Sequence, residues 1–209
     1  DQYDWIKQNR KTLTIISINR TIIPLIENGI IPDFVICLDS SPDLIVDMNV
    51  DSKLTQNISL IYFPIIQPKI LSNWNGKRFY TYPSKINNRE ILEDFYQKYP
   101  AETLEVQGSV VLSAVDFAIK LNAEEIYLTG FDFSFIGENT HLKGVVRNQT
   151  SENQNNSDLI LNGEGGMNPT NLSMKGFLRD LERFIKLNPQ SNFINCSKKG
   201  AKISGVNYL

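Results

Sequence analysis

Residues 107–135, QGSVVLSAVDFAIKLNAEEIYLTGFDFSF, predict a glycine turn, a helix, and a strand that ends in a second polar turn. Apolar residues recur at helical spacing after Gly108 and Ser109, which predicts a helix over 110–121 with Ser109 as its N-cap. The strand expected at 125–129 follows, and it leads into Gly130. Because the first N–H groups of a helix are unpaired and its dipole is positive there, a glycine turn before a helix binds anions well.

The polar residues at these two turns have two interpretations. In an open α/β sheet, ligands collect beyond the carboxyl ends of the strands, where Gly130 and Asp132 would lie. Taken singly, however, Gly108-Ser109 is also a common plain helix cap, and an aspartate after a strand is often a turn former. Only the combination of the two turns favours a nucleotide site.

The segment upstream predicts a parallel crossover. Residues 13–18 and 34–38 are short apolar runs rich in β-branched residues, and a helix expected at 22–28 lies between them. A strand, a helix and a second strand within about thirty residues are typical of a parallel βαβ unit. Asn19 follows the first strand and Asp39 the second. We therefore expect an α/β fold with a mostly parallel sheet flanked by helices.

The rest of the chain continues the alternation of strands and helices. It predicts strands at residues 59–63, 77–82 and 192–196, and helices at 89–98 and 174–187. Residues 137–168 are mostly polar, which predicts a loop. Because this loop leaves directly from the end of the strand expected to bind a ligand, it is either a mobile lid over the site or a disordered insertion.

Composition and charge exclude several classes of protein. With 209 residues, 41% of them hydrophobic, the chain is long enough for one domain with a sizeable core. Its net charge of -2 gives no electrostatic footprint for nucleic acid. No apolar run reaches the roughly 18 residues of a membrane-spanning helix, and the N-terminus lacks the pattern of a signal peptide, so we expect a cytoplasmic protein without a membrane span. Cys37 and Cys196 lie in apolar segments, where we expect free thiols, no disulfide and no metal cage.

Three segments together resemble a known family. They are GSVVLSAVDFAIKLNAEEIYLTGFDFSF followed by Thr140 and His141, SINRTIIPLIENGIIPDFVICLDSSPD upstream, and INCSKKGAKISG near the end. They resemble the catalytic domain of the motility accessory factor (Maf) glycosyltransferases, a group related to the MptE-like 6-hydroxymethylpterin diphosphokinases. They are also similar to bacterial sialyltransferases of the Campylobacter type, which use CMP-sialic acid. The resemblance implies a Rossmann-like, sialyltransferase-like fold and a single domain over residues 1–209.

The resemblance also implies roles for the residues that match the motifs of those families. Asn19 matches the asparagine that touches the nucleotide in the sialyltransferases, and Asp39 matches the polar residue that ends the next strand. Gly108 and Ser109 match the turn expected near the phosphate of the nucleotide. The Gly-x-Asp-Phe segment, expected around the cytidine ribose, matches Gly130, Asp132 and Phe133.

Two features depart from the family pattern. Those families begin with a Gly-x-Gly-Pro-Ser-Leu strand end, and this sequence starts at Asp1, about where that motif would have finished, so we expect a fragment that lacks the first glycine-rich strand. The catalytic histidine of the sialyltransferases would fall near Gly166 or Met167, where the sequence has none. His141, the only histidine, matches the Thr-His of Maf-like sequences, and it is either a solvated loop residue or a catalytic base.

The activity implied by the resemblance is transfer of a nonulosonic acid of the sialic, pseudaminic or legionaminic type. CMP carries the sugar, and a protein hydroxyl receives it, such as a serine or threonine of flagellin. A glycosyltransferase of this kind needs no cofactor beyond its CMP-sugar donor, because it has to hold the nucleotide, stabilise the departing phosphate and remove a proton from the acceptor. His141 is the expected base, since histidine titrates near neutral pH, and Asp39 is the reserve.

Two alternatives stay open. In the first, the chain transfers pyrophosphate from Mg-ATP to a pterin alcohol, as in the MptE-like relatives. Asp39 and Asp132 would then share a Mg²⁺ ion, and Arg20 would face the phosphates. In the second, the domain has lost turnover and acts as a non-catalytic nucleotide-sugar-binding or protein-interaction module.

Overall fold

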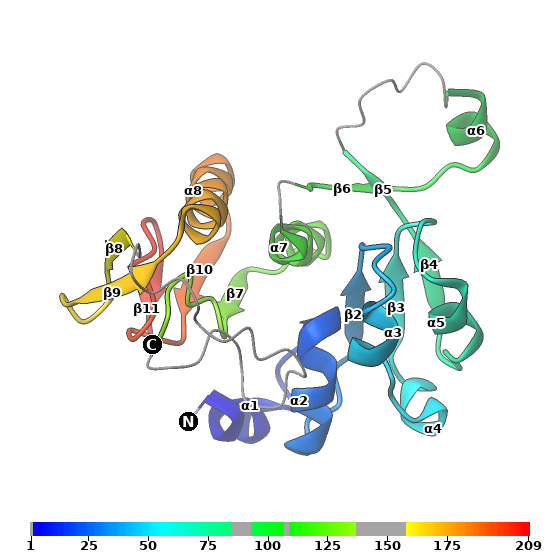
Figure 1. The fold of residues 1–209 in the computed structure, drawn as a ribbon, viewed down its shortest axis with the longest axis horizontal. Helices are drawn as coiled ribbons and strands as arrows, with labels where there is room; N and C mark the ends of the chain where they lie inside the picture. The colour runs from blue at the N-terminus through cyan, green and yellow to red at the C-terminus, as the bar shows by residue number, and fades with distance from the viewer. Residues whose placement is uncertain (1, 85–92, 107–108, 137–157) are drawn as a thin grey trace. The chain divides into compact units, whose positions relative to one another are not determined.

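The computed structural model describes residues 2–84, 93–106, 109–136 and 158–209, which fall into two compact units (Figure 1). The first unit is Asn9–Phe117, and the second joins Asp1–Gln8 to Ala118–Leu209. The expectation of a single domain over residues 1–209 stays a prediction. Within the described residues, no helix is both long enough and apolar enough to cross a membrane.

The first unit is built on a parallel sheet with the strand order β1-β2-β3-β4. Its strands are β1 (Ile16–Ile18), β2 (Phe34–Cys37), β3 (Ser59–Tyr62) and β4 (Arg78–Tyr80). Ile18 pairs with Ile36, and Cys37 pairs with Tyr62. Because every pair is parallel, the carboxyl ends of all these strands lie at one edge of the sheet. The expected fold class, a mostly parallel sheet flanked by helices, is confirmed.

Short helices connect these strands, and several of them cover one face of the sheet. They are η1 (Asn19–Thr21), α2 (Ile22–Glu27), α3 (Leu44–Asp47), α4 (Ser52–Thr55) and α5 (Pro68–Ser72). Ile22 and Leu44 from the helices join Val35 and Leu60 from the strands in one buried cluster. Gly29 follows α2 with a φ of 74°, a left-handed conformation that suits glycine and ends the helix. The path from β1 through α2 to β2 is the predicted crossover.

The helix α7 (Val110–Lys120) covers the other face of the same sheet. Its residue Val110 shares a buried cluster with Ile36 and Leu38, which alternate with the residues of the first cluster and so point to the opposite side. The ring of Phe117 meets the ring of Phe34 edge to face, with 5.1 Å between centroids. Since Phe34 begins β2, α7 runs antiparallel to the strands and begins at their carboxyl edge.

A small second sheet extends the first unit beyond β4. The strand expected at 77–82 divides at Thr81 into β4 and β5 (Tyr82–Pro83), and β5 pairs in parallel with β6 (Thr103–Leu104). The division has a cause in the hydrogen bonds: the Thr81 N–H donates to Tyr62 O, whereas the Tyr82 N–H donates to Glu102 O. The described part of the helix expected at 89–98 is α6 (Glu93–Lys98).

The second unit contains a parallel sheet with the order β11-β10-β7. Its strands are β7 (Glu125–Leu128), β10 (Asn192–Asn195) and β11 (Asn207–Tyr208). The amphipathic helix α8 (Leu172–Leu187) buries Leu178, Leu181 and Ile185, as its sequence pattern predicts. The helix α1 (Gln2–Asn9) carries Trp5, whose ring lies 4.9 Å from that of Tyr127 on β7.

Part of the stretch expected to be a loop is an antiparallel hairpin. The strands β8 (Asp158–Leu161) and β9 (Met167–Thr170) pair with each other, which corrects the expectation of a loop for 158–168. Asn162 makes the turn, because its side-chain oxygen accepts from the N–H groups of Glu164 and Gly166. The expected mobile loop or lid otherwise falls on residues 137–157, which lie outside the described residues.

Candidate functional site at the carboxyl edge of the parallel sheet

The structure places three of the predicted nucleotide-binding residues at one edge of the first unit. Asn19 follows β1 directly, Asp39 comes after the carboxyl end of β2, and Ser109 precedes α7, which begins at the same edge. Gly130, Asp132 and Phe133 belong to the second unit. Gly108 and His141 lie outside the described residues, so the base assigned to His141 stays a prediction.

Asn19 lies in η1, which Thr21 holds against the end of β1. The hydroxyl of Thr21 donates to Ile18 O at 3.1 Å, and the N–H of Ile18 donates back to that hydroxyl at 3.2 Å. Asn19 is 6% exposed, and its side chain makes no hydrogen bond to any described residue. A carboxamide offers two donors and an acceptor, so Asn19 has free capacity for a ligand.

Arg20, the neighbour of Asn19, is already engaged by an acidic side chain. Its Nε lies 3.7 Å from Oδ2 of Asp47, a largely buried residue at the end of α3. Removing the cation would leave the Asp47 carboxylate buried without this partner, which is unfavourable. The positive charge of Arg20 is thus partly compensated by Asp47, so less of it is available to a ligand.

Asp39 is exposed, and its carboxylate shapes the loop after β2. Oδ1 accepts from the N–H of Ser41 at 2.9 Å, a local turn that aspartate often forms. The side chain of Gln67, which precedes α5, donates to Ser40 O and so joins the loops after β2 and β3. Below this loop, burial raises the pKa of the Cys37 thiol to about 12. A neutral thiol is a poor nucleophile, so Cys37 is not a reactive group at neutral pH, and the role of Asp39 as the reserve base stays a prediction.

Ser109 caps α7, as the sequence predicted. Its hydroxyl oxygen accepts from the N–H of Val111 at 3.3 Å. The segment that leads to it is fixed by α7, since Glu105 N–H donates to a carboxylate oxygen of Asp116 at 2.8 Å and Glu105 O accepts from the hydroxyl of Ser113. The plain-cap interpretation of Ser109 is therefore confirmed, and its role toward a phosphate stays a prediction.

The turn after β7 in the second unit is unusual in its backbone. Gly130 has a φ of 73° and Phe133 a φ of 46°, which is uncommon for a residue other than glycine. Burial raises the pKa of the Asp132 carboxyl. Its backbone oxygen accepts from the N–H of Ala201 at 2.6 Å, and a Cβ added to Gly200 would lie 2.6 Å from Asp132 Cα.

The β8–β9 hairpin forms hydrogen bonds with the turn after β7, which the sequence did not predict. The amide of Asn168 donates to the hydroxyl of Ser134 at 3.0 Å and to Lys199 O at 2.6 Å. The hydroxyl of Thr170 donates to Phe133 O at 2.9 Å. The run Asn162-Gly-Glu-Gly-Gly was the available signal, because asparagine and glycine together favour a tight hairpin turn.

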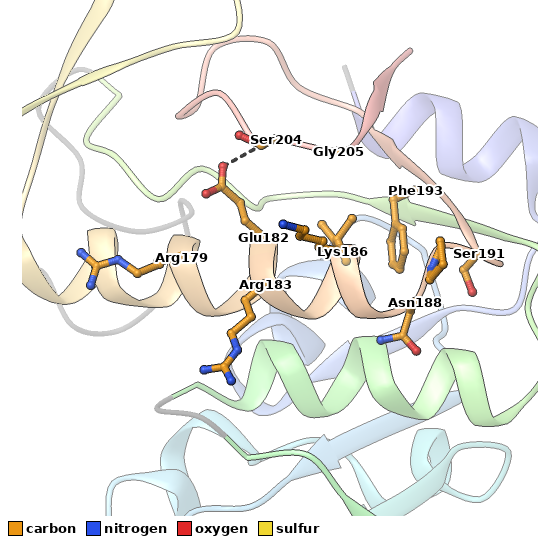
Figure 2. Close-up of a pocket in the computed structure, with 11 residues that line it drawn as sticks. Arg179, Glu182, Arg183, Lys186, Asn188, Ser191, Phe193, Ser204 and Gly205 are labelled. Atoms are coloured by element: carbon orange, nitrogen blue, oxygen red, sulfur yellow. Dashed lines mark hydrogen bonds between the residues drawn. The ribbon is translucent and has the colours of Figure 1, made fainter.

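A shallow concavity of about 650 Å³ in the second unit lies apart from these residues (Figure 2). Its lining includes Arg179, Arg183 and Lys186 from α8, together with Ser191. Ser191 precedes β10, so the concavity is at the amino edge of that sheet, whereas Asp132 follows a carboxyl end. We assign it no part in the chemistry, because no residue predicted to bind the nucleotide lines it.

Two comparisons with known proteins bear on these observations. The sequence model of the family described as 6-hydroxymethylpterin diphosphokinase MptE-like matches residues 1–138. The solved structure of the Maf glycosyltransferase from Magnetospirillum magneticum AMB-1 is similar to this chain, with a TM-score of 0.73 and 19% sequence identity. The match covers 99% of this chain and 31% of that chain, and it shows a shared fold. No curated protein matches. The resemblance to the Maf and MptE-like proteins is confirmed at the level of family and fold, whereas the similarity to the sialyltransferases stays a prediction.

Proposed function

We propose that this chain, which belongs to the 6-hydroxymethylpterin diphosphokinase MptE-like family, is a glycosyltransferase that uses a CMP-activated nonulosonic acid. The acceptor is a protein hydroxyl, such as a serine or threonine of flagellin, and the reaction takes place in the cytoplasm without a bound cofactor. The observation that carries the proposal is the fold shared with a Maf glycosyltransferase over 99% of this chain. Its polar residues at the carboxyl edge of a parallel sheet support it.

In the proposed reaction, the bond between the sugar and the CMP phosphate breaks, and the acceptor oxygen bonds to the sugar. Asn19 binds the nucleotide through its unpaired amide, and the start of α7 after Ser109 faces the phosphate as negative charge develops there. Asp39 or His141 takes the proton of the acceptor hydroxyl. The resemblance assigns contacts with the ribose to Gly130, Asp132 and Phe133, and with the phosphate to Gly108, and these roles stay predictions.

The second candidate, pyrophosphate transfer from Mg-ATP to a pterin alcohol, is favoured by the family model over residues 1–138. A triphosphate needs more positive charge than a CMP-sugar, which carries a single phosphate. Arg20 is the cation beside Asn19, and Asp47 already neutralises part of it at 3.7 Å. This observation supports the CMP-sugar as the first candidate, and a Mg²⁺ ion is needed only in the second.

Calorimetric titration with CMP and with Mg-ATP separates the two candidates. We expect CMP to bind, and Asn19→Ala to weaken that binding about tenfold, the effect of losing one good hydrogen bond to a charged or polar ligand. The matched control is Asn57→Ala, an exposed asparagine before β3 at the opposite edge of the sheet. Tight Mg-ATP binding without CMP binding would reverse the order of the two candidates.

Turnover is measured as CMP release from CMP-N-acetylneuraminic acid in the presence of flagellin. Asp39→Asn should lower turnover by a larger factor than it weakens CMP binding, because the amide cannot take the proton. His141→Ala tests the other base in the same way. Bound CMP without any product from several CMP-sugars would point instead to a non-catalytic binding module.

A further inference from the structure

The shallow concavity of the second unit has two walls that pack on each other (Figure 2). The C-terminal half of α8 forms one wall, Ser204 and Gly205 form the other, and Ile185 and Phe193 also line the hollow. The N–H of Ser204 donates to Oε1 of Glu182 at 2.8 Å. A Cβ added to Gly205 would lie 3.1 Å from Cγ2 of Ile185, so the two walls are in close contact. The hollow of about 650 Å³ is therefore part of the folded unit.

Three exposed cations of α8 line this hollow: Arg179, Arg183 and Lys186. They are four and three residues apart, which places them on one side of the helix within about 10.5 Å along its axis. None of them forms an ion pair with a residue that the structure describes. Lys186 lies in the last turn of α8, where the helix dipole favours a cation, but the two arginines lie further from that end. Their charges are available to a ligand in solvent.

Glu182, the acid in this lining, is turned toward the opposite wall. It lies three residues after Arg179 and four before Lys186, which is the spacing at which helix surface ion pairs form. Its carboxylate instead accepts from the N–H of Ser204, as the dashed line in Figure 2 shows. The lining thus has three cations and one carboxylate, an excess of two positive charges. A surface of this charge attracts anionic partners.

The shape and lining of the hollow discriminate between anionic partners. A single strand of nucleic acid stacks its bases on exposed aromatic rings, whereas Phe193, the aromatic residue in the described lining, is only 2% exposed. An anionic bilayer is flat and is bound by clusters of about four to eight basic residues, whereas this surface is concave and has three. An extended polypeptide presents alternate side chains on one face about 6.6 Å apart, close to the rise of about 6 Å between Arg179 and Arg183.

We propose that the concavity lined by Arg179, Arg183 and Lys186 docks an extended acidic segment of a partner protein, whose alternate carboxylates pair with these cations. The pairs lie at the rim and in solvent, so each contributes little and the three act together. The inference is independent of the proposed function, because no residue assigned to the nucleotide lines this hollow.

Fluorescence anisotropy with a labelled peptide of alternating glutamate and valine tests the inference. We expect this peptide to bind at about 20 mM salt and to be released as the salt rises toward about 0.5 M, because exposed ion pairs are screened. The same peptide with glutamine in place of glutamate should bind about tenfold more weakly, the sum of three exposed pairs. Failure of the glutamate peptide to bind, or equal binding of both peptides, would overturn the inference.

Charge-removing variants locate the binding. Arg179→Gln and Arg183→Gln should each weaken binding of the glutamate peptide about two- to fivefold. Lys198→Gln is the control, because Lys198 is an exposed cation after the carboxyl end of β10, at the other edge of that sheet. Glutamine keeps the helix propensity, and removing one of two like charges four residues apart should leave the melting temperature unchanged or raised. Unchanged affinity in the double variant would refute the proposal.

Two further probes distinguish the class of partner. Oligothymidylate and vesicles that contain phosphatidylserine present phosphates and lipid headgroups in place of carboxylates on an extended backbone. Both should bind more weakly than the glutamate peptide at the same salt concentration. Tighter binding of either probe, weakened by Arg183→Gln, would assign the concavity to nucleic acid or to a membrane surface and reject an acidic polypeptide.

Discussion

Replacing Gly200 by alanine tests the tightest approach between two loops of the second unit. A Cβ at this position would lie 2.6 Å from Asp132 Cα and 2.9 Å from both its backbone oxygen and Oδ1. Carbon atoms in contact prefer about 3.5 to 4.0 Å, so the two loops must separate by about 1 Å. The change is purely steric, because Gly200 is not among the glycines with a positive φ.

The cost follows from what holds the two loops together. The Ala201 N–H donates to Asp132 O at 2.6 Å, and the Gly163 N–H donates to Gly200 O at 3.2 Å. Two lengthened hydrogen bonds cost about 0.5 to 1.5 kcal/mol each, and the overpacking adds about 1 kcal/mol or more. The lower entropy of the unfolded alanine chain offsets about 0.4 to 1 kcal/mol. We expect Gly200→Ala to lower the free energy of unfolding by about 2 to 3 kcal/mol.

Urea unfolding followed by tryptophan fluorescence measures this value, since Trp5 packs on Tyr127 in the same unit. The control is Gly176→Ala in the second turn of α8, where a Cβ would meet nothing within 4 Å. That variant should gain about 0.5 to 1 kcal/mol, because alanine favours a helix. A loss of less than about 1 kcal/mol in Gly200→Ala would show that the loops separate freely, and the reasoning about Asp132 would then be wrong.

Three further predictions concern stability. Gly76→Ala should destabilise the first unit by more than about 2 kcal/mol in urea unfolding, because its Cβ would collide with the backbone oxygens of Ile58 and Thr55; a smaller loss would mean that the turn before β4 gives way. Asn171→Ala should cost about 1 kcal/mol in thermal unfolding, since the Asn171 side chain caps α8 by accepting from Met174 N–H at 2.9 Å; an unchanged melting temperature would contradict this. The third prediction concerns alkaline pH. The thiol of Cys37 has its ordinary pKa of 9.0 in the unfolded chain and a pKa of about 12 in the folded protein. Between these pH values unfolding releases a proton, so the free energy of unfolding falls as the pH rises. Cys37→Ala should therefore flatten the decline of unfolding free energy measured between about pH 9 and 11, by up to about 1.4 kcal/mol per pH unit, and parallel declines in both proteins would show that the thiol titrates normally.

The parallel crossover was predictable from the sequence because its signals are local. The β-branched run ending at Ile18 and the apolar run beginning at Phe34 form strands, and Gly29 ends the helix between them, as expected. Ser109 and the inner face of α8 were equally visible, since capping and helical periodicity depend on neighbours in sequence.

The remaining features depend on contacts between distant residues. The strand divides at Thr81 because the backbone hydrogen bonds change acceptor there, from Tyr62 O for the Thr81 N–H to Glu102 O for the Tyr82 N–H. No local sequence pattern indicates this change. Gly200 looks like an ordinary turn glycine until Asp132 is placed against it. The unpaired oxygen of Glu105 is likewise a property of its surroundings. Asn19 and Asp39 were found because strand ends are visible in sequence, whereas their roles toward a nucleotide stay predictions.

The position of β4 has a consequence for how this protein behaves at high concentration. Among the described strands, β4 pairs with β3 alone, and each of its residues, including Phe79 and Tyr80, is exposed. An exposed edge strand can pair with other extended chains, and a charged side chain on that strand usually prevents such pairing. Arg78 supplies that charge, with its guanidinium donating to Leu71 O at 2.9 Å, and we therefore expect this arginine to hinder the addition of other chains to β4.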